Sequence, residues 1–154
     1  MREQAANYMD ESLSEIEGVR VLPRDPRHEK RALYRYIFAI DPPAFGATNK
    51  VVARAMQAEG IPCWTGYDPM YRYDLFRPND SRLAVPSAFP EYFDLENMHL
   101  PVTERISARE GMWLDEEIFR DGEVAVDEVV SALKKVQMAL ASDASLADRI
   151  RALD

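Results

Sequence analysis

"ALYRYIFAI", residues 32–40, is the stretch that decides the fold of this chain. It is rich in aromatic and β-branched residues, which favour strands. Tyr34, Tyr36, Phe38 and Ile40 occupy every second position, so they lie on one side of an extended backbone. We predict a strand over residues 32–40 with that side buried, closed by a turn at "DPPAFG".

The segments around this strand give further signals. Residues 2–17 are predicted to form a helix, because apolar residues recur at helical spacing and Gly18 can end it. A second helix is predicted from Thr48, with a side-chain cap, to Gly60. The other predicted elements are strands at 19–22, 61–65 and 112–114, helices at 102–109 and 126–140, and a polar tail at 142–154 that can form one more helix.

A long irregular segment runs from residue 66 to residue 90. It contains four prolines and no sustained period, so we predict an ordered loop that runs over the surface. The element order mixes helices and strands without regular βαβ alternation. The sequence therefore predicts an α+β fold, with a small, largely antiparallel sheet and helices packed on one face.

Composition excludes several classes of protein. The 154 residues suit one domain with a real core, and the net charge of −8 is the wrong sign for tracking nucleic acid phosphates. No apolar run approaches the length that spans a bilayer, and the N-terminus does not resemble a signal peptide, so we expect no membrane association. The single cysteine cannot form an internal disulfide, which favours a reducing, cytoplasmic setting.

Few residues of the sequence are candidates for catalysis or metal binding by this chain alone. For His28 and His99 the sequence offers no orienting partner, so surface or structural roles are preferred. Cys63 is interpreted as a buried small hydrophobe. The acidic run 115–117 is interpreted as solvated surface, because consecutive side chains point in different directions. No catalytic, cofactor-binding or metal-binding residue is predicted.

The densest cluster of rings is "GIPCWTGYDPMYRYDLF", residues 60–76. Pro69 fixes a turn from which Tyr67 and Tyr71 depart with hydroxyls that need a partner. Together with Arg72 they are our candidates for the wall of a substrate cleft. The remaining rings are interpreted as packing support: Trp64, Tyr73 and Phe76. Several side chains of this loop either fold back onto the sheet or await a partner: Met70, Leu75, Phe76, Phe89 and Phe93.

Five blocks of the chain, in order, resemble the C-terminal part of DegT/StrS-type aminotransferases, which are pyridoxal-phosphate enzymes of fold type I. The likeness is closest to the branch acting on cyclitols and in 3-amino-5-hydroxybenzoate formation. There, an "AEGIP…GY-x-P-x-Y…LF" segment precedes a "P-x-x-E-R…WL" segment. The resemblance covers nearly the whole chain, except for about the last dozen residues. The blocks are residues 7–19, 33–46, 55–76, 100–114 and 125–136.

The resemblance implies a division of the chain. Residues 1–17 would be the helix leading from a large cofactor domain, 18–141 the small domain, and 142–154 a polar helical tail. In the family a lysine of the large domain holds the cofactor as a Schiff base. This chain carries none in the corresponding hydroxyl-rich setting, so we expect no cofactor site in it and no activity of the chain alone. The lysines present are Lys30, Lys50, Lys134 and Lys135.

The resemblance also implies partners and leaves alternatives open. The partners would be the large domain or a second copy, since the family works as a homodimer, and a small-molecule substrate. The chain would be the small-domain portion of an aminotransferase, closing the substrate cleft. Alternatively, it is a non-catalytic binding module derived from that domain, or a remnant without activity. If the chain is a fragment of an aminotransferase, we expect an exposed apolar surface where the large domain belongs. If it is a binding module, we expect that surface to be polar.

One segment departs from the family pattern. After "MWL" the family commonly continues with proline or histidine and an aliphatic stretch, but here residues 115–119 are "DEEIF". This difference puts in question any contact that the position makes with the large domain or partner subunit.

Overall fold

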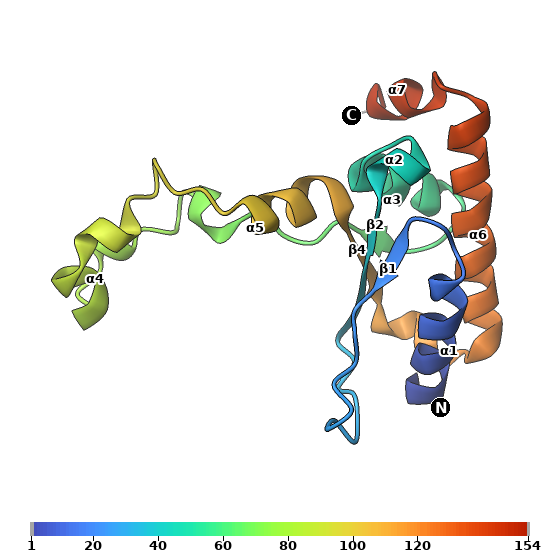
Figure 1. Cartoon of the computed structure of the whole chain (residues 1–154), viewed down its shortest axis with the longest axis horizontal. Helices are drawn as coiled ribbons and strands as arrows, with labels where there is room; N and C mark the ends of the chain where they lie inside the picture. Colours follow the sequence, from blue (N-terminus) through green and yellow to red (C-terminus); the bar gives the residue numbers. More distant parts are fainter. Residues whose placement is uncertain (1, 154) are drawn as a thin grey trace.

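The computed structural model of the chain describes residues 2–153, which form an α+β fold as predicted (Figure 1). The strands are β1 (Val19–Val21), β2 (Arg35–Ile40), β3 (Cys63–Trp64) and β4 (Gly111–Asp115). The helices are α1 (Arg2–Ser14), α2 (Pro42–Phe45), α3 (Asn49–Ala58), α4 (Ala84–Ala88), α5 (Pro101–Arg105), α6 (Glu123–Ser142) and α7 (Leu146–Arg151). Single 3₁₀ or π turns occupy Met70–Arg72, Pro78–Asp80, Pro90–Phe93, Ile106–Glu110 and Glu116–Arg120.

The four strands form one antiparallel sheet in the order β1-β2-β4-β3. The predicted central strand β2 lies between β1 and β4, and Phe38 pairs with Val21 on one side and Met112 on the other. Leu114 of β4 pairs with Tyr36 and with Cys63. This register aligns the apolar side chains of three strands on one face of the sheet.

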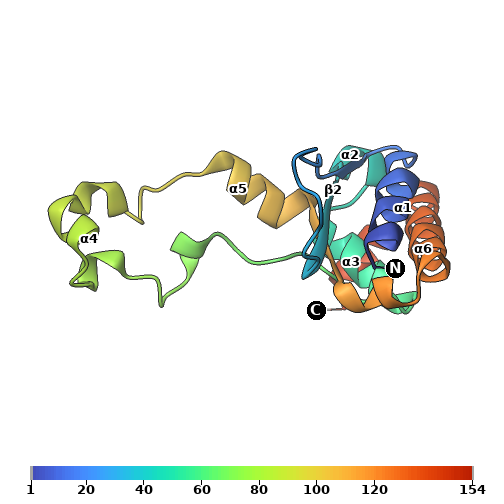
Figure 2. The ribbon, with the colours of Figure 1, turned by 90° about the horizontal axis from the view of Figure 1, so that it is seen from below.

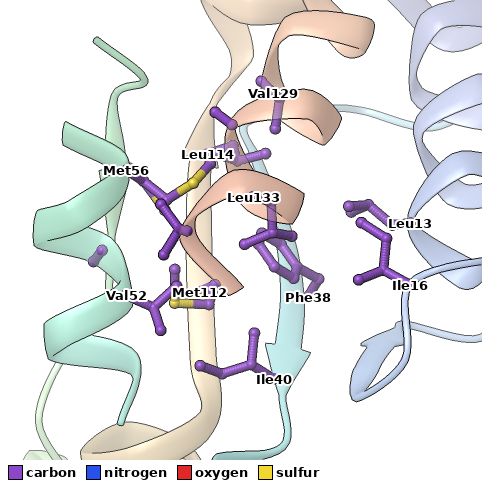
Figure 3. Packing of buried hydrophobic residues seen from close by; sticks show 14 of the residues in the cluster. Leu13, Ile16, Phe38, Ile40, Val52, Met56, Met112, Leu114, Val129 and Leu133 are labelled. Atoms are coloured by element: carbon purple, nitrogen blue, oxygen red, sulfur yellow. The ribbon is translucent and has the colours of Figure 1, made fainter. Parts of the chain in front are cut away.

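Helices α1, α3 and α6 cover that face and enclose the core (Figure 2). Figure 3 shows Phe38 and Leu133 packed between the sheet and α6, with Met56 of α3 beside Leu114. Most of the apolar positions that recur along α6 are buried as their spacing predicts: Val126, Val129, Leu133, Val136 and Leu140. Val130, which belongs to the same predicted stripe, is partly buried against the core. Burial of these side chains is the main stabilising term for the body of the protein.

Several element boundaries differ from the sequence prediction. The strand begins at Arg35, so Tyr34 precedes it and is 71% exposed, whereas Tyr36 is buried. The N-terminal helix ends at Ser14 instead of residue 17. The "DPPAFG" segment is a single helical turn, α2, because the two prolines occupy its first positions, where they are compatible with a helix.

The start of α3 is fixed by a different residue from the one predicted. Thr48 makes no side-chain capping hydrogen bond. Asn49 is fully buried instead, and its Nδ2 donates to the carbonyl oxygens of Ser107 and Gly111, each at 3.0 Å. Its Oδ1 accepts from the backbone N–H of Lys50 at 2.9 Å. One amide thus joins α3 to the start of β4.

The chain between β3 and α5 forms a projecting arm, defined here as residues 66–100. Both perpendicular views show it extending away from the body (Figures 1 and 2). The predicted long proline-rich loop is therefore present, but it projects from the body instead of running over its surface. Glu104 joins its two legs at the base. Within the arm only Pro69 and Pro86 are buried. Tyr67 contacts Trp113 of the sheet, whereas Met70, Leu75 and Phe89 lie in solvent.

The C-terminal tail forms α7, which packs its buried Ala147 against the core. Arg54 of α3 donates to the carbonyl oxygen of Ile150 at 3.2 Å. Helix α1 contributes Met9 and Leu13 to the same core. The division into a connecting helix, a domain and a tail stays a prediction.

We expect Asn49→Ala to lower the free energy of unfolding by about 2–3 kcal/mol, because it leaves buried carbonyl oxygens without a donor. Urea unfolding measures this loss. The control is Asn79→Ala, which removes an exposed amide and should cost less than about 0.5 kcal/mol. Equal losses for the two variants would contradict the role assigned to Asn49.

Gly66 and Gly60 form a matched pair for testing how the arm leaves the sheet. Both have positive φ, +77° and +85°, but a Cβ on Gly66 would lie 2.6 Å from Cε2 of Trp113, whereas none of the described atoms lies within 4 Å of one on Gly60. We expect Gly60→Ala to cost about 1 kcal/mol of stability and Gly66→Ala about 1–3 kcal/mol more. Equal costs in urea unfolding would show that the contact with Trp113 does not fix the arm.

Candidate functional site

The candidate site lies at the base of the arm, beside the face of the sheet that α1, α3 and α6 leave uncovered. We call this the open face; its strands present Arg20, Ile37, Trp64 and Trp113. Trp64 and Trp113 are direct neighbours across β3 and β4, and Trp64 is 50% exposed. The ring of Tyr67 meets Trp113 edge-on, with 5.1 Å between centroids and an angle of 86°. These rings form an aromatic surface.

A carboxylate, Glu104 of α5, holds the two legs of the arm together. It accepts a hydrogen bond from the Tyr71 hydroxyl of the outgoing leg. It also accepts from the backbone N–H of Leu100 at 2.9 Å, and Nδ1 of His99 lies 2.8 Å from its Oε2. The guanidinium of Arg72 lies 3.9 Å from the carboxylate and 5.7 Å from the centre of the Tyr71 ring. A single side chain thus holds together Tyr71 and Leu100, which are 29 positions apart in the sequence.

These contacts shift the pKa values of Tyr71 and Glu104. The hydrogen bond to Glu104 raises the pKa of Tyr71 above its ordinary value. The Tyr71 hydroxyl, followed by the Leu100 N–H, lowers the pKa of Glu104, since both favour the ionised carboxylate. Glu104 is therefore charged and Tyr71 is a neutral hydrogen-bond donor at neutral pH.

A second ion cluster borders the open face. Glu110, which is 8% exposed, accepts from Nη2 of Arg20 at 2.7 Å and Nε of Arg105 at 2.9 Å. Both guanidinium side chains remain more than half exposed. The carboxylate therefore fixes two arginines at this edge while much of their surface faces solvent.

The predicted cleft residues separate into two places. Tyr71 and Arg72 line a groove between the legs of the arm, together with Arg77, Phe93 and Glu96. Tyr67 does not line it and lies on the open face with Trp113. Its backbone carbonyl accepts from the Ser107 hydroxyl at 3.0 Å, which anchors the outgoing leg to the turn before β4.

The residues interpreted as packing support also differ in their environment. Trp64 contributes to the open face, and Tyr73 accepts a hydrogen bond from the backbone N–H of Asp68 at 3.1 Å. Phe76 is half-buried on the arm.

Sequence reasoning missed the central part played by Glu104, although it quoted the "P-x-x-E-R" motif that contains it. A usable signal existed, because Pro101 marks the first position of a helix and an acidic residue in the first turn can bond back to the preceding N–H. His99 acts as a second contact to this carboxylate.

Two other residues considered from the sequence, Cys63 and His28, lie away from the base of the arm. Cys63 is fully buried, and burial raises the pKa of its thiol to about 12. His28 lines a surface hollow of about 260 Å³ with Arg24 and Arg31, arginines that pair with Glu3 and Asp10. Among residues 2–153, no cluster of His, Cys, Asp and Glu could hold a metal ion. Over the same range, no helix is long and apolar enough to cross a membrane.

The acidic run that departs from the family pattern is matched by nearby arginines. Arg35 lies 2.8 Å from Asp115. Glu116 pairs with Arg2 at 2.8 Å and with Arg120 at 2.5 Å. Much of the acidic charge is thus neutralised within the chain itself.

The described residues do not fit pyridoxal phosphate. A Schiff-base lysine must be desolvated enough to lose its proton, yet all four lysines are exposed. Lys135 in addition pairs with Glu59 at 2.6 Å. The aldehyde of the cofactor would therefore meet only solvated ammonium groups on this chain.

Comparison with known proteins places this fold. No family model matches the chain. A protein of Micromonospora echinospora named as an L-glutamine:3-amino-2,3-dideoxy-scyllo-inosose aminotransferase is 31% identical over 140 residues. Proteins of the same name from Streptoalloteichus tenebrarius and Streptomyces kanamyceticus are each 26% identical. In each case 88% of this chain is matched, but it spans only 34% of the relative's length.

The crystal structure of 3-amino-5-hydroxybenzoic acid synthase has the same fold, with a TM-score of 0.63 and 21% identity. The match covers 88% of this chain and 33% of the synthase chain. The chain therefore corresponds to about one third of the length of proteins named as scyllo-inosose aminotransferases, which agrees with the predicted resemblance to a segment of a sugar or cyclitol aminotransferase. The likeness to the synthase shows the same fold.

Proposed function

We propose that the chain is the small-domain portion of a pyridoxal-phosphate-dependent aminotransferase acting on sugars or cyclitols, and that it closes the substrate cleft. The observation that carries this proposal is that 88% of the chain matches one third of three proteins named as cyclitol aminotransferases. The remaining two thirds would supply the lysine and the phosphate site. The chain itself would not catalyse transamination.

In this proposal the arm base is the wall of the cleft. Tyr67, with Trp113, offers ring surface to an apolar face of a substrate. Arg72, in the separate groove between the legs of the arm, offers a cation beside the ring of Tyr71. Glu104 acts as a positioning residue, since it fixes Tyr71 and both legs of the arm.

The alternative of a matured binding module is less well supported. Such a module should carry a polar surface where the large domain belongs. The arm instead keeps large hydrophobic side chains in solvent: Tyr67, Met70, Leu75, Leu83, Val85, Phe89 and Tyr92. This pattern favours a portion of a larger enzyme.

The test is reconstitution. The chain is titrated with pyridoxal phosphate, alone and mixed with the other two thirds of the Micromonospora echinospora relative expressed as a separate chain. Borohydride reduction and mass analysis then locate adducts. We expect only slow, scattered labelling of the chain alone, and a stoichiometric adduct on one lysine of the added chain in the mixture. A stoichiometric adduct on one of this chain's own lysines would overturn the proposal.

Glu104→Gln should loosen the base of the arm in a pH-dependent way. The pKa of Glu104 is lowered by folding, so its contribution to stability is complete above its ordinary pKa and is lost as pH falls through the folded pKa. We expect the amide of Leu100 to lose hydrogen-exchange protection in the variant at neutral pH. The difference from wild type should shrink as pH falls from about 5 towards about 3.

The matched control is Glu96→Gln, which neutralises an exposed carboxylate on the same arm. It should leave the protection of Leu100 unchanged at every pH. A Glu104→Gln effect that is constant with pH would show that the charge of Glu104 does not hold the arm.

A further inference from the structure

We propose that the surface hollow beside the loop of residues 22–34, which joins β1 to β2, binds a small molecule with two or more carboxylates (Figure 1). This is the hollow of about 260 Å³ that His28 lines, and none of its lining residues belongs to the arm. The inference goes beyond the proposed function, because binding there requires neither the cofactor nor the rest of an aminotransferase. It follows from the charge of the hollow, the fixed positions of its arginines and its size.

The segment around the hollow is basic in an acidic chain. Residues 20–35 carry six lysine or arginine residues and two acidic ones, whereas the whole chain has a net charge of −8. A small anion is therefore attracted to this segment and repelled by much of the remaining surface. The lining itself holds four basic side chains and two acidic ones: Arg24, His28, Arg31, Arg35, Asp10 and Asp25.

The two aspartates of the lining are already paired. Asp10 accepts from Nη2 of Arg31 at 2.6 Å and from the Tyr36 hydroxyl at 2.7 Å. Asp25 accepts from Nε of Arg27 at 2.9 Å, and Arg27 does not line the hollow. These carboxylates therefore oppose an incoming anion less than two unpaired carboxylates would.

The three arginines of the lining are held in place. Arg24 pairs with Glu3, and Arg35 lies 2.8 Å from Asp115, although neither carboxylate lines the hollow. The side chains of Arg24, Arg31 and Arg35 are 34%, 22% and 29% exposed, whereas nine other ion-paired arginines expose more than half of theirs. Little conformational freedom is left for them to lose when a ligand binds.

Each of these arginines also keeps a donor for a ligand. Their contacts with carboxylates go through the terminal Nη atoms. The Nε–H groups of Arg24, Arg31 and Arg35 make no hydrogen bond with any of residues 2–153. A guanidinium binds a carboxylate through two parallel N–H bonds, one of which can come from Nε. The hollow thus offers three guanidinium groups to an anionic ligand.

The layout of the hollow decides the class of ligand. Arg24 and Arg31 are anchored to carboxylates of α1 and Arg35 to one of β4, so the three cations are tied to different elements. Separate carboxylates on one molecule match such an arrangement better than a single compact anion does. Apolar side chains such as Leu22 and Leu33 contact the carbon skeleton between them. Ligand pockets usually measure about 300–1,000 Å³, so this hollow suits a small molecule.

NMR of the ¹⁵N-labelled wild-type chain locates the site without any substitution, with citrate as the probe. We expect a Kd of about 1 mM or tighter at low ionic strength, with shifts of the Nε–Hε resonances of Arg24, Arg31 and Arg35. The resonance of Arg149, which pairs with Asp143 in the C-terminal part of the chain, should not move. Equal shifts at Arg149 would show unspecific attraction and overturn the proposal. A spectrum unchanged by about 10 mM citrate would overturn it as well.

Substitutions test the arginines one at a time. We expect Arg24→Gln and Arg35→Gln each to raise the Kd for citrate about tenfold, since each removes a charged fork of donors. The control is Arg149→Gln, which removes an ion-paired guanidinium elsewhere on the surface and should leave the Kd unchanged. If the Arg24 and Arg35 variants bind citrate as tightly as the control does, the hollow is not the site.

A comparison of anions tests the class of ligand. Acetate has one carboxylate and should bind at least about tenfold more weakly than citrate at the same pH and ionic strength. Inorganic phosphate that binds more tightly than citrate would overturn the assignment to carboxylates. Failure of reconstitution with pyridoxal phosphate would leave these results untouched, so the two proposals fail separately.

Discussion

The buried amide of Asn49 is the interaction on which the rest of the structure depends. A fully buried polar side chain is stable only when its hydrogen bonds are made, and here both N–H groups and the oxygen have backbone partners. The partners lie in α3, in the turn at Ser107 and at Gly111, where β4 begins. The same amide therefore sets the position of a central strand and of the turn that anchors the arm.

From this anchor the chain divides into two parts with different sources of stability. The body buries apolar side chains of three helices against one face of the sheet. The arm has almost no core and takes its direction from polar contacts at its base, chiefly those of Glu104. Its conformation is thus well specified where it leaves the body, whereas few buried side chains constrain it further out.

The sequence predicts the body well because burial imposes periodic patterns. Tyr36, Phe38 and Ile40 alternate and are buried, and α6 follows its apolar period. Tyr34 continues the same alternation but lies outside the strand, because nothing in a two-residue period marks where pairing with β4 begins. Thr48 and Asn49 are both capping residues by type, and only the tertiary structure decides which one finds partners.

The arm and the site are less predictable for a related reason. The prolines exclude regular structure, yet whether such a segment lies on the body or projects depends on contacts between its two ends. Those contacts join Tyr71 to Glu104, 33 residues apart in the sequence. Proximity in sequence placed Tyr67, Tyr71 and Arg72 in one group, but the turn at Met70–Arg72 sends Tyr67 and Tyr71 to different surfaces.

The geometry also limits what each of these residues can do for a ligand. The Tyr71 hydroxyl already donates to a charged carboxylate, so donating to a substrate would cost that bond, and its ring is the part free for contact. Arg72 is 3.9 Å from the same carboxylate, beyond hydrogen-bond distance, and so retains donors for an anionic or hydroxylated group. We therefore propose that Arg72 is the polar recognition element of the pair and that Tyr71 offers its ring.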